Sequence, residues 1–112
     1  MTNKLIGLLG LTRRAGKLTT GFDAVAGKVA AGQAGLVLLA ADLSEKTEKE
    51  LRRATADKTP EIRRLPLDKE TIAAALGLYK PVGVLAVGDS GLAAAIRRSC
   101  RDDLEEELPY DD

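Results

Sequence analysis

The sequence predicts an α/β fold, a three-layer α-β-α sandwich in which a four-stranded mixed sheet lies between about five helices. The chain has 112 residues, which is enough for one domain with a single core. Apolar residues make up 45% of it but aromatic residues only 3%. Leu, Val, Ile and Ala must therefore fill the core, which suits helices packed on a small sheet. Helix and strand patterns also alternate along the chain, as this class requires.

The first part of the chain contains two helix patterns and two strand patterns. Apolar positions recur at helical spacing over residues 3–14, and residues 18–20 form a short strand candidate. A second helical stripe begins at Phe22 and ends at Gly32, a residue type that is common just after helices. Residues 36–40 are continuously apolar, which is typical of a central strand covered on both faces.

A charged third helix is predicted at Ser44–Ala56, because Asp42 and Ser44 both offer an N-cap and the positions after them follow helical spacing. We expect Leu51 and Ala54 to face inward, and the many Lys, Arg and Glu residues of this segment to face solvent. Residues 62–65 form the third strand candidate.

The end of the chain completes the alternation with a helix, a strand and a helix. Asp68 caps a fourth helix that stops at Gly77, and residues 82–87 form a second buried strand. A cap at residues 89–90 starts a fifth helix that reaches about Arg101. The predicted order is therefore α-β-α-β-α-β-α-β-α.

The formal net charge of zero conceals an asymmetry between the body of the chain and its end. Residues 102–112 hold seven of the 17 acidic residues and no basic one, so residues 1–101 carry a net charge of +7. We therefore expect one basic domain at residues 1–101 and an acidic, disordered, solubilising tail at residues 102–112. The alternative is that the tail competes with external polyanions for a basic surface of the domain.

Several classes of site are disfavoured by the composition. The chain has one cysteine, Cys100, and no histidine, so we expect no internal disulfide, no metal site and no cofactor. The apolar run at residues 5–11 is too short for the core of a signal peptide, and residues 36–41 have the length of a strand. We expect a cytoplasmic protein that does not enter a membrane.

Two glycine patterns resemble catalytic motifs but lack the residues that catalysis needs. Gly16 and Gly21 have the spacing of P-loop glycines, but Phe22 and Asp23 stand where that loop needs Lys and then Ser or Thr. Residues 88–91, GDSG, lack the spacing of a nucleophile elbow, and there is no histidine to act as base. We expect no enzymatic activity.

The stretch RRAGKLTTGFDAVAGK, residues 13–28, combines basic residues with glycines before a helix. Backbone N–H groups at a helix N-terminus attract phosphate, and nearby cations add a salt-dependent attraction to a polyanion. The candidate cations are Arg13, Arg14, Lys17 and Lys28. The alternative is that the glycines only end one helix and begin the next, and that the cations form a solvated face.

Four blocks of the sequence carry a family resemblance: RRAGKLTTGFDAV, GQAGLVLLAADLS, AALG and VGVLAVGDSGLA. Together they cover about residues 4–100, and they resemble the YlxQ-type bacterial branch of the superfamily that includes the ribosomal proteins L7Ae and L30e. The resemblance implies an alternating α/β sandwich that binds kink-turns in RNA.

In the wider family, a run Gly-x-Asn-Glu-x-x-Lys opens the second helix, and its Asn and Glu read the sheared G·A pairs of the kink. The matching run here begins at Gly21, and only this glycine is kept. Asp23 replaces the amide with an acceptor-only carboxylate, Ala24 has no acceptor, and Gly27 has no cation, although Lys28 is adjacent. These departures weaken the expected readout of bases.

The resemblance implies a second contact, an apolar loop that cradles nucleotides flipped out of the kink. Here this loop is GLYKPVG, residues 77–83, in which Tyr79 beside Lys80 is a candidate platform for an unpaired base. The alternative is that Tyr79 covers the end of the core. The full set of candidate RNA-binding residues is Arg13, Arg14, Lys17, Gly21, Phe22, Asp23, Lys28, Leu78, Tyr79 and Lys80.

The function expected from these observations is non-catalytic binding of structured, kink-turn-like RNA. The resemblance implies ribosomal RNA or another kink-turn RNA as partner and an association with ribosome or ribonucleoprotein components. We expect a monomer. One rival is a protein-interaction module that keeps the fold while RNA recognition has weakened. A second rival is a small-ligand site at the sheet edge, for which we find too few convergent polar groups to name a ligand.

Overall fold

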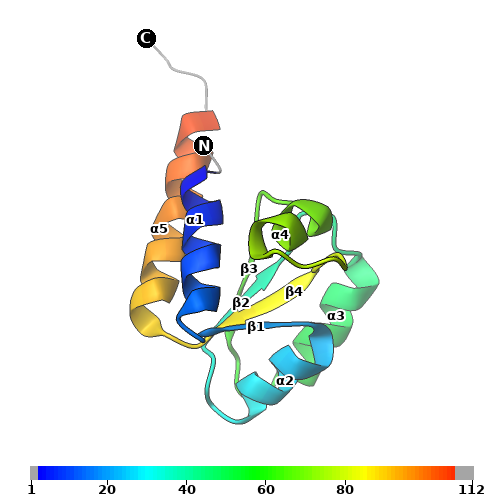
Figure 1. Ribbon diagram of the computed structural model, residues 1–112. Coiled ribbons are helices and arrows are strands. Elements are labelled where there is room, and N and C mark those ends of the chain that lie inside the picture. Colours follow the sequence, from blue (N-terminus) through cyan, green and yellow to red (C-terminus); the bar gives the residue numbers. More distant parts are fainter. Residues whose placement is uncertain (1–2, 108–112) are drawn as a thin grey trace.

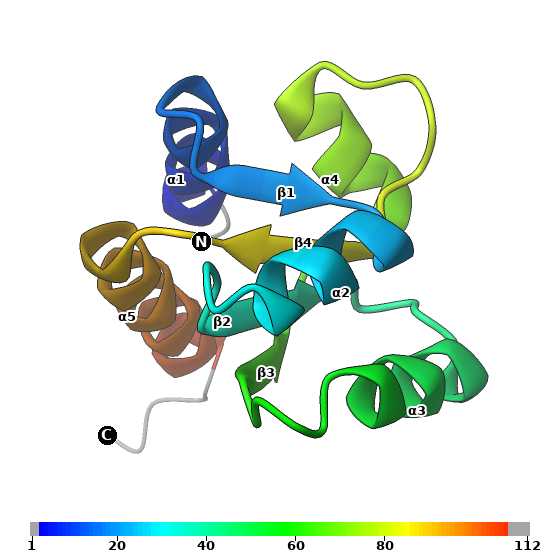
Figure 2. The same ribbon diagram turned by 90° about the horizontal axis from the view of Figure 1, so that it is seen from below.

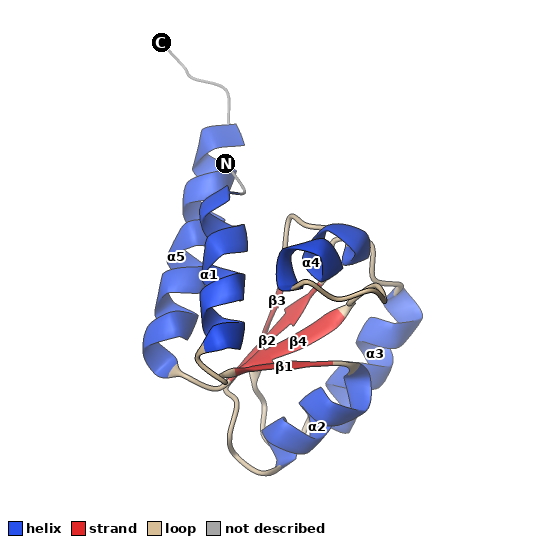
Figure 3. Cartoon of the chain, viewed as in Figure 1, coloured by secondary structure: helices blue, strands red, loops and turns tan. Residues whose placement is uncertain are grey.

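Helices and strands alternate along the whole described chain (Figure 1, Figure 3). The computed structural model describes residues 3–107, and the side chains of residues 4–100. The helices are α1 (Asn3–Arg14), α2 (Phe22–Ala30), α3 (Glu45–Ala54), α4 (Lys69–Leu76) and α5 (Ser90–Glu107). The strands are β1 (Leu18–Thr20), β2 (Leu36–Leu39), β3 (Glu61–Arg64) and β4 (Val84–Val87). The predicted α/β class and order of elements are confirmed.

The four strands form one mixed sheet in the order β1-β4-β2-β3. β4 is antiparallel to both of its neighbours, and β2 is parallel to β3. The two strands with continuous apolar sequence, LVLL in β2 and VLAV in β4, are the central pair and are fully buried. β1 and β3 form the edges of the sheet and are only half-buried along most of their length.

Helices cover both faces of the sheet, so the predicted three-layer sandwich is also confirmed (Figure 1, Figure 2). On one face, the paired Leu38 and Leu85 belong to a core with α1, α4 and α5. On the other face, the paired Val37 and Ala86 belong to a core with α2 and α3. Successive strand residues point to opposite faces, so each central strand supplies both cores.

One side chain of α3 lies differently from the prediction. Ala54 is exposed, and Thr55 is buried in its place. α3 packs through positions four residues apart, Thr47, Leu51 and Thr55, and its helical hydrogen bonding ends at Ala54. The hydroxyl of Thr55 donates to the backbone carbonyl of Leu51 at 2.9 Å, so burial leaves this polar group satisfied.

α5 extends six residues beyond its predicted end, to Glu107 rather than to about Arg101. The sequence between Gly91 and Pro109 contains neither glycine nor proline, so no residue in it interrupts a helix. The rest of the acidic tail that the sequence predicts to be disordered, residues 108–112, lies outside the described residues.

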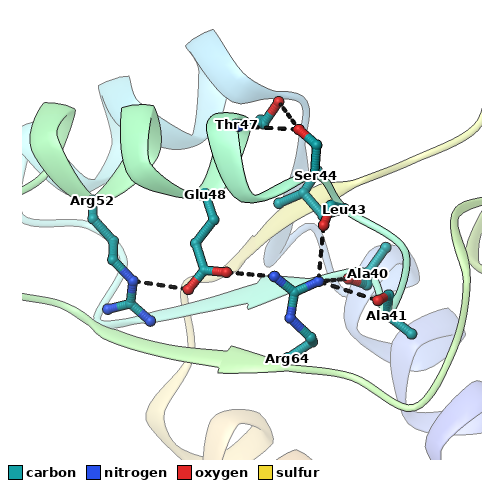
Figure 4. A network of polar contacts seen from close by, with 8 residues as sticks. All are labelled: Ala40, Ala41, Leu43, Ser44, Thr47, Glu48, Arg52 and Arg64. Carbon is teal, nitrogen blue, oxygen red and sulfur yellow. Dashed lines mark hydrogen bonds and ion pairs between the residues drawn. The ribbon is translucent and has the colours of Figure 1, made fainter.

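The guanidinium of Arg64, at the end of β3, joins this edge strand to the segment between β2 and α3 (Figure 4). Its Nη2 forms an ion pair with Glu48 of α3, and Glu48 also accepts a hydrogen bond from Nε of Arg52 at 3.0 Å. Its Nη1 lies within 3.2 Å of three backbone carbonyl oxygens, those of Ala40, Ala41 and Leu43. The network therefore fixes the start of α3 against the sheet.

We predict that this network makes stability depend on acid pH. Hydrogen bonds from Arg52 and Arg64 hold the pKa of Glu48 below its ordinary value of 4.5. A carboxyl whose pKa is lower in the folded than in the unfolded state contributes stability above the unfolded pKa and loses it as the pH falls through the folded pKa. Glu48→Gln should lower the free energy of unfolding by about 1 kcal/mol or less at pH 7. The difference should vanish near pH 2.

Urea unfolding of both proteins at pH 7 and at pH 2–4 measures this difference. Glu50→Gln, at an exposed position of the same helix, is the matched control and should follow the wild type at every pH. A Glu48→Gln variant with an unchanged urea midpoint at pH 7 would show that the network adds nothing to stability.

Candidate nucleic-acid interface

The turn that starts α2 depends on Gly21. This residue has φ of +97° and ψ of +147°, a backbone conformation that is essentially restricted to glycine. Its N–H donates to the carbonyl of Val84 at 3.0 Å, and its carbonyl accepts from the N–H of Val25 at 2.9 Å. Gly21 has no side chain to cap the helix, so the N–H groups of residues 22–24 point out of the first turn without a side-chain cap. This end of α2 is therefore a positively polarised surface.

The loop between α4 and β4 is fixed at both ends and exposed at its tip. Gly77 ends α4 in the left-handed conformation, and the N–H of Leu78 donates to the carbonyl of Ala73 at 2.9 Å. Leu78 packs against the core, and Val82 at the other end is buried. Between them the side chain of Tyr79 is 103% exposed. The alternative that Tyr79 covers the end of the core is therefore wrong.

The turn and the loop together enclose a hollow of about 370 Å³, which we call the tyrosine hollow. Its lining residues are Thr20, Gly21 and the loop residues Leu78, Tyr79, Lys80, Pro81, Val82 and Gly83. β1 and β4 are antiparallel neighbours, so the end of β1 lies beside the loop that leads into β4 (Figure 2). Four of the predicted site residues, Gly21, Leu78, Tyr79 and Lys80, thus meet in one place.

Phe22 and Asp23 adjoin the tyrosine hollow at the first turn of α2, but their side chains differ in exposure. Phe22 is half-buried and packs against the core beneath α2. Asp23 is exposed. Of the two, Asp23 is the side chain that a ligand bound at this turn can reach.

The two arginines at the end of α1 have different surroundings. Nη1 of Arg13 donates to the carbonyl of Leu76 at 2.6 Å, at the C-terminus of α4. Arg13 therefore ties α1 to the base of the loop that carries Tyr79, and it satisfies a terminal carbonyl of α4. Arg14 is exposed, and its guanidinium lies beside Gly10 of the same helix.

Lys17 and Lys28 lie together at the other end of β1. They line a second hollow, which we call the lysine hollow and which shares no residue with the first. Lys17 and Gly21 flank the three-residue strand β1, so their Cα atoms are about 13 Å apart along it, whereas Thr19 and Thr20, which line one hollow each, are consecutive residues. The structure therefore distributes the candidate residues between two neighbouring hollows along β1.

A sequence profile of the ribosomal protein L7Ae/L30e/S12e/Gadd45 family matches residues 3–96, which include every element except the last part of α5. The chain belongs to this family. No curated protein sequence matches it.

Two solved structures share the L7Ae-family fold with this chain. A protein of unknown function from Bacillus halodurans is 33% identical, with a TM-score of 0.70, and the match covers 84% of this chain and 97% of that one. A 15.5kD RNA-binding protein from Giardia lamblia is 21% identical, with a TM-score of 0.66, and the match covers 94% of this chain and 88% of that one. At this identity the second likeness concerns the fold alone.

This L7Ae-family chain departs from the Gly-x-Asn-Glu-x-x-Lys run of the wider family at surface positions. Asp23, Ala24 and Gly27 are all exposed on α2. A Cβ atom added at Gly27 would meet no atom within 4 Å. Packing of the core therefore does not force these replacements, and they change only what the surface presents to a ligand.

Three polar lining residues of the hollows are absent from the predicted site residues. Thr20 lines the tyrosine hollow, and Thr19 and Gln33 line the lysine hollow. Thr20 directly precedes Gly21, and Gln33 is the one polar side chain in the segment from Gly32 to Gly35. A polar residue beside a structural glycine was the available signal, but threonine and glutamine are common at such positions without any function.

The described residues contain neither a metal-binding cluster nor a membrane-spanning helix. Within this part of the chain, no three His, Cys, Asp or Glu residues are grouped so that they could hold a metal ion. None of its helices is both long enough and apolar enough to cross a membrane.

Proposed function

We propose that this chain is a non-catalytic, cytoplasmic protein that binds structured RNA and recognises a kink-turn-like bend through its shape and backbone. It acts as a monomer of the YlxQ-type bacterial branch and associates with ribosomal RNA, or another kink-turn RNA, in ribosome assembly or translation. The observation that carries the proposal is the fully exposed ring of Tyr79 at the rim of an apolar hollow, beside the uncapped start of α2. Membership of the family and the fold shared with an RNA-binding protein support it.

The tyrosine hollow offers three kinds of contact to a bent RNA. A base that leaves the stack lies against Tyr79, since single unpaired bases bind to proteins largely by stacking on aromatic rings. Lys80 attracts the phosphate of that nucleotide. The N–H groups at the start of α2 take a further phosphate, and the carboxylate of Asp23 accepts a hydrogen bond from a guanine amino group.

Recognition by this surface depends more on shape than on base identity. Ala24 and Gly27 offer neither an acceptor nor a cation where the wider family has Glu and Lys. A bend that places an unstacked base and a phosphate at the right separation is therefore what the protein selects.

A salt series with two RNAs tests the proposal. We expect the protein to bind a kink-turn hairpin about tenfold or more tighter than a matched duplex without the kink, and to keep this preference in moderate salt. Equal, weak binding to both RNAs that disappears in moderate salt would contradict it, because a basic surface alone behaves in that way.

The loss of Glu and Lys from exposed positions of α2 also favours a second candidate, a module that binds protein. The charged surface of α3 is available to such a partner. Capture of partners from an extract treated with nuclease separates the two functions. Complexes that persist without RNA favour the protein-binding module, and complexes that are lost favour RNA binding.

A further inference from the structure

The lysine hollow has a volume of about 410 Å³ and is positively charged. Its lining residues are Gly16, Lys17, Thr19, Lys28, Gly32, Gln33, Ala34 and Gly88. The two lysines are the only ionisable residues in this lining. Half of the lining residues are glycine or alanine, so a bulky chain can approach the backbone closely there.

Local structure holds both lysines at this hollow. The N–H of Lys17 donates to the carbonyl of Thr12 at 3.0 Å, and its carbonyl accepts from the N–H of Gly88 at 2.8 Å. Nζ of Lys28 donates to Oε1 of Gln33 at 3.2 Å. An ammonium has three protons, so this bond orients Lys28 and leaves two donors for a ligand.

The helix dipole explains the position of only one of these two lysines. Lys28 lies in the last turn of α2, where a positive charge is favourable without any ligand. Lys17 lies in the connection between α1 and β1, outside any helix, and is exposed. Two like charges that line one hollow repel each other, so their juxtaposition favours an anion between them.

The hollow continues into a second one of about 290 Å³, with which it shares Gly32, Gln33, Ala34 and Gly88. This continuation reaches Arg97, whose Nε donates to Glu61 at 2.6 Å, and Asp89, whose carboxylate accepts from the N–H of Leu92 at 2.8 Å. Positive charge without an acidic partner is thus concentrated at the lysine end, and phosphate groups are expected there rather than beside the Asp89 carboxylate.

We infer that the lysine hollow binds the sugar-phosphate backbone of a second segment of the RNA that occupies the tyrosine hollow. The inference rests on the proposed function and adds a geometric requirement. Lys17 and Gly21 are about 13 Å apart along β1, so a stacked RNA stem that starts at the Gly21 turn reaches Lys17 after about four steps of roughly 3.4 Å. The partner is therefore a bend with a stem attached, rather than the bend alone.

The experiment compares three proteins on a set of kink-turn hairpins whose two stems are lengthened one at a time. The proteins are the wild type, Lys17→Ala/Lys28→Ala and the control Lys46→Ala/Lys49→Ala. The control removes the same charge from exposed positions of α3. Affinity is measured by fluorescence anisotropy between 50 and 200 mM salt.

We expect the Lys17→Ala/Lys28→Ala variant to show a salt slope about 1.5 smaller than the wild type on RNAs with a long stem. Between 50 and 200 mM salt this means that the wild type loses about eightfold more affinity than the variant. On the shortest RNA the two proteins should have equal slopes. The control should follow the wild type on every RNA, and Lys17→Arg/Lys28→Arg should restore the wild-type slope.

The outcomes distinguish this inference from the proposed function. If the Lys17→Ala/Lys28→Ala variant binds kink-turn RNA selectively and its affinity has the same salt dependence as that of the wild type, only the inference about the lysine hollow is overturned. Equal effects of the two lysine pairs also overturn it, because they indicate general attraction by charge. A wild type without selective binding to any kink-turn RNA overturns both proposals.

Discussion

Tyr79→Ala is expected to weaken binding to a kink-turn RNA by about five- to 150-fold, because stacking of a base on an aromatic ring contributes about 1–3 kcal/mol. The variant should melt at the same temperature as the wild type. The Tyr79 side chain is 103% exposed, so its removal leaves no cavity and breaks no core contact. Anisotropy with a labelled hairpin and a thermal melt measure the two quantities.

Two controls separate stacking from other effects of the substitution. Tyr79→Phe keeps the ring and should bind RNA within about threefold of the wild type. Leu11→Ala removes a large apolar side chain that is 45% exposed on α1 and outside the tyrosine hollow, so it should leave affinity unchanged. If Tyr79→Ala bound the RNA with wild-type affinity, the exposed Tyr79 ring would no longer support the proposed function.

The parts of the fold that sequence predicts well are those governed by local patterns. Continuous apolar runs correctly predicted β2 and β4 as the buried central strands. Two predicted N-caps are also confirmed. The Ser44 hydroxyl accepts from the N–H of Thr47 at 3.1 Å, and the Asp68 carboxylate accepts from the N–H of Thr71 at 2.7 Å. Each of these features depends on a few consecutive residues, which the sequence displays directly.

Features that depend on the end of a helix were less predictable. Ala54 and Thr55 follow Leu51 by three and four positions, and both spacings suit one helical face. Hydrophobicity favours burial of the alanine, but the threonine is buried instead because its hydroxyl bonds to the carbonyl of Leu51. Sequence patterns do not reveal this hydrogen bond before the end of the helix is known.

The division of the candidate site follows from the way the chain turns back after β1. Sequence places Lys17 and Gly21 only four residues apart and Lys28 seven residues further on. In the structure, β1 carries the chain away from Lys17, and α2 returns it, so that Lys28 lies at the hollow of Lys17 and Gly21 lies at the other end. Separation along the chain therefore predicts the wrong neighbours, and the pairing of β1 with β4 decides the right ones.

Gly21→Ala is expected to lower the free energy of unfolding by about 1–3 kcal/mol, because alanine must adopt the φ of +97° that the turn into α2 requires. The penalty is conformational, since a Cβ atom added at this position would meet no atom within 4 Å. For a chain of this size the melting temperature should fall by about 4–8 °C per kcal/mol. Thermal and urea unfolding measure this loss in the absence of RNA.

Gly27→Ala is the matched control, because the same atoms are added at another exposed glycine of α2 that also has open space around it. Gly27 has ordinary helical geometry, so alanine should raise stability by about 0.5–1 kcal/mol through its higher helix propensity. A lower free energy of unfolding in Gly21→Ala together with a higher one in Gly27→Ala would show that the turn itself requires glycine at position 21. The family would then keep this glycine even without RNA. Equal stabilities would mean that the turn relaxes readily, and the retained glycine would then favour a direct role in close approach of the RNA backbone.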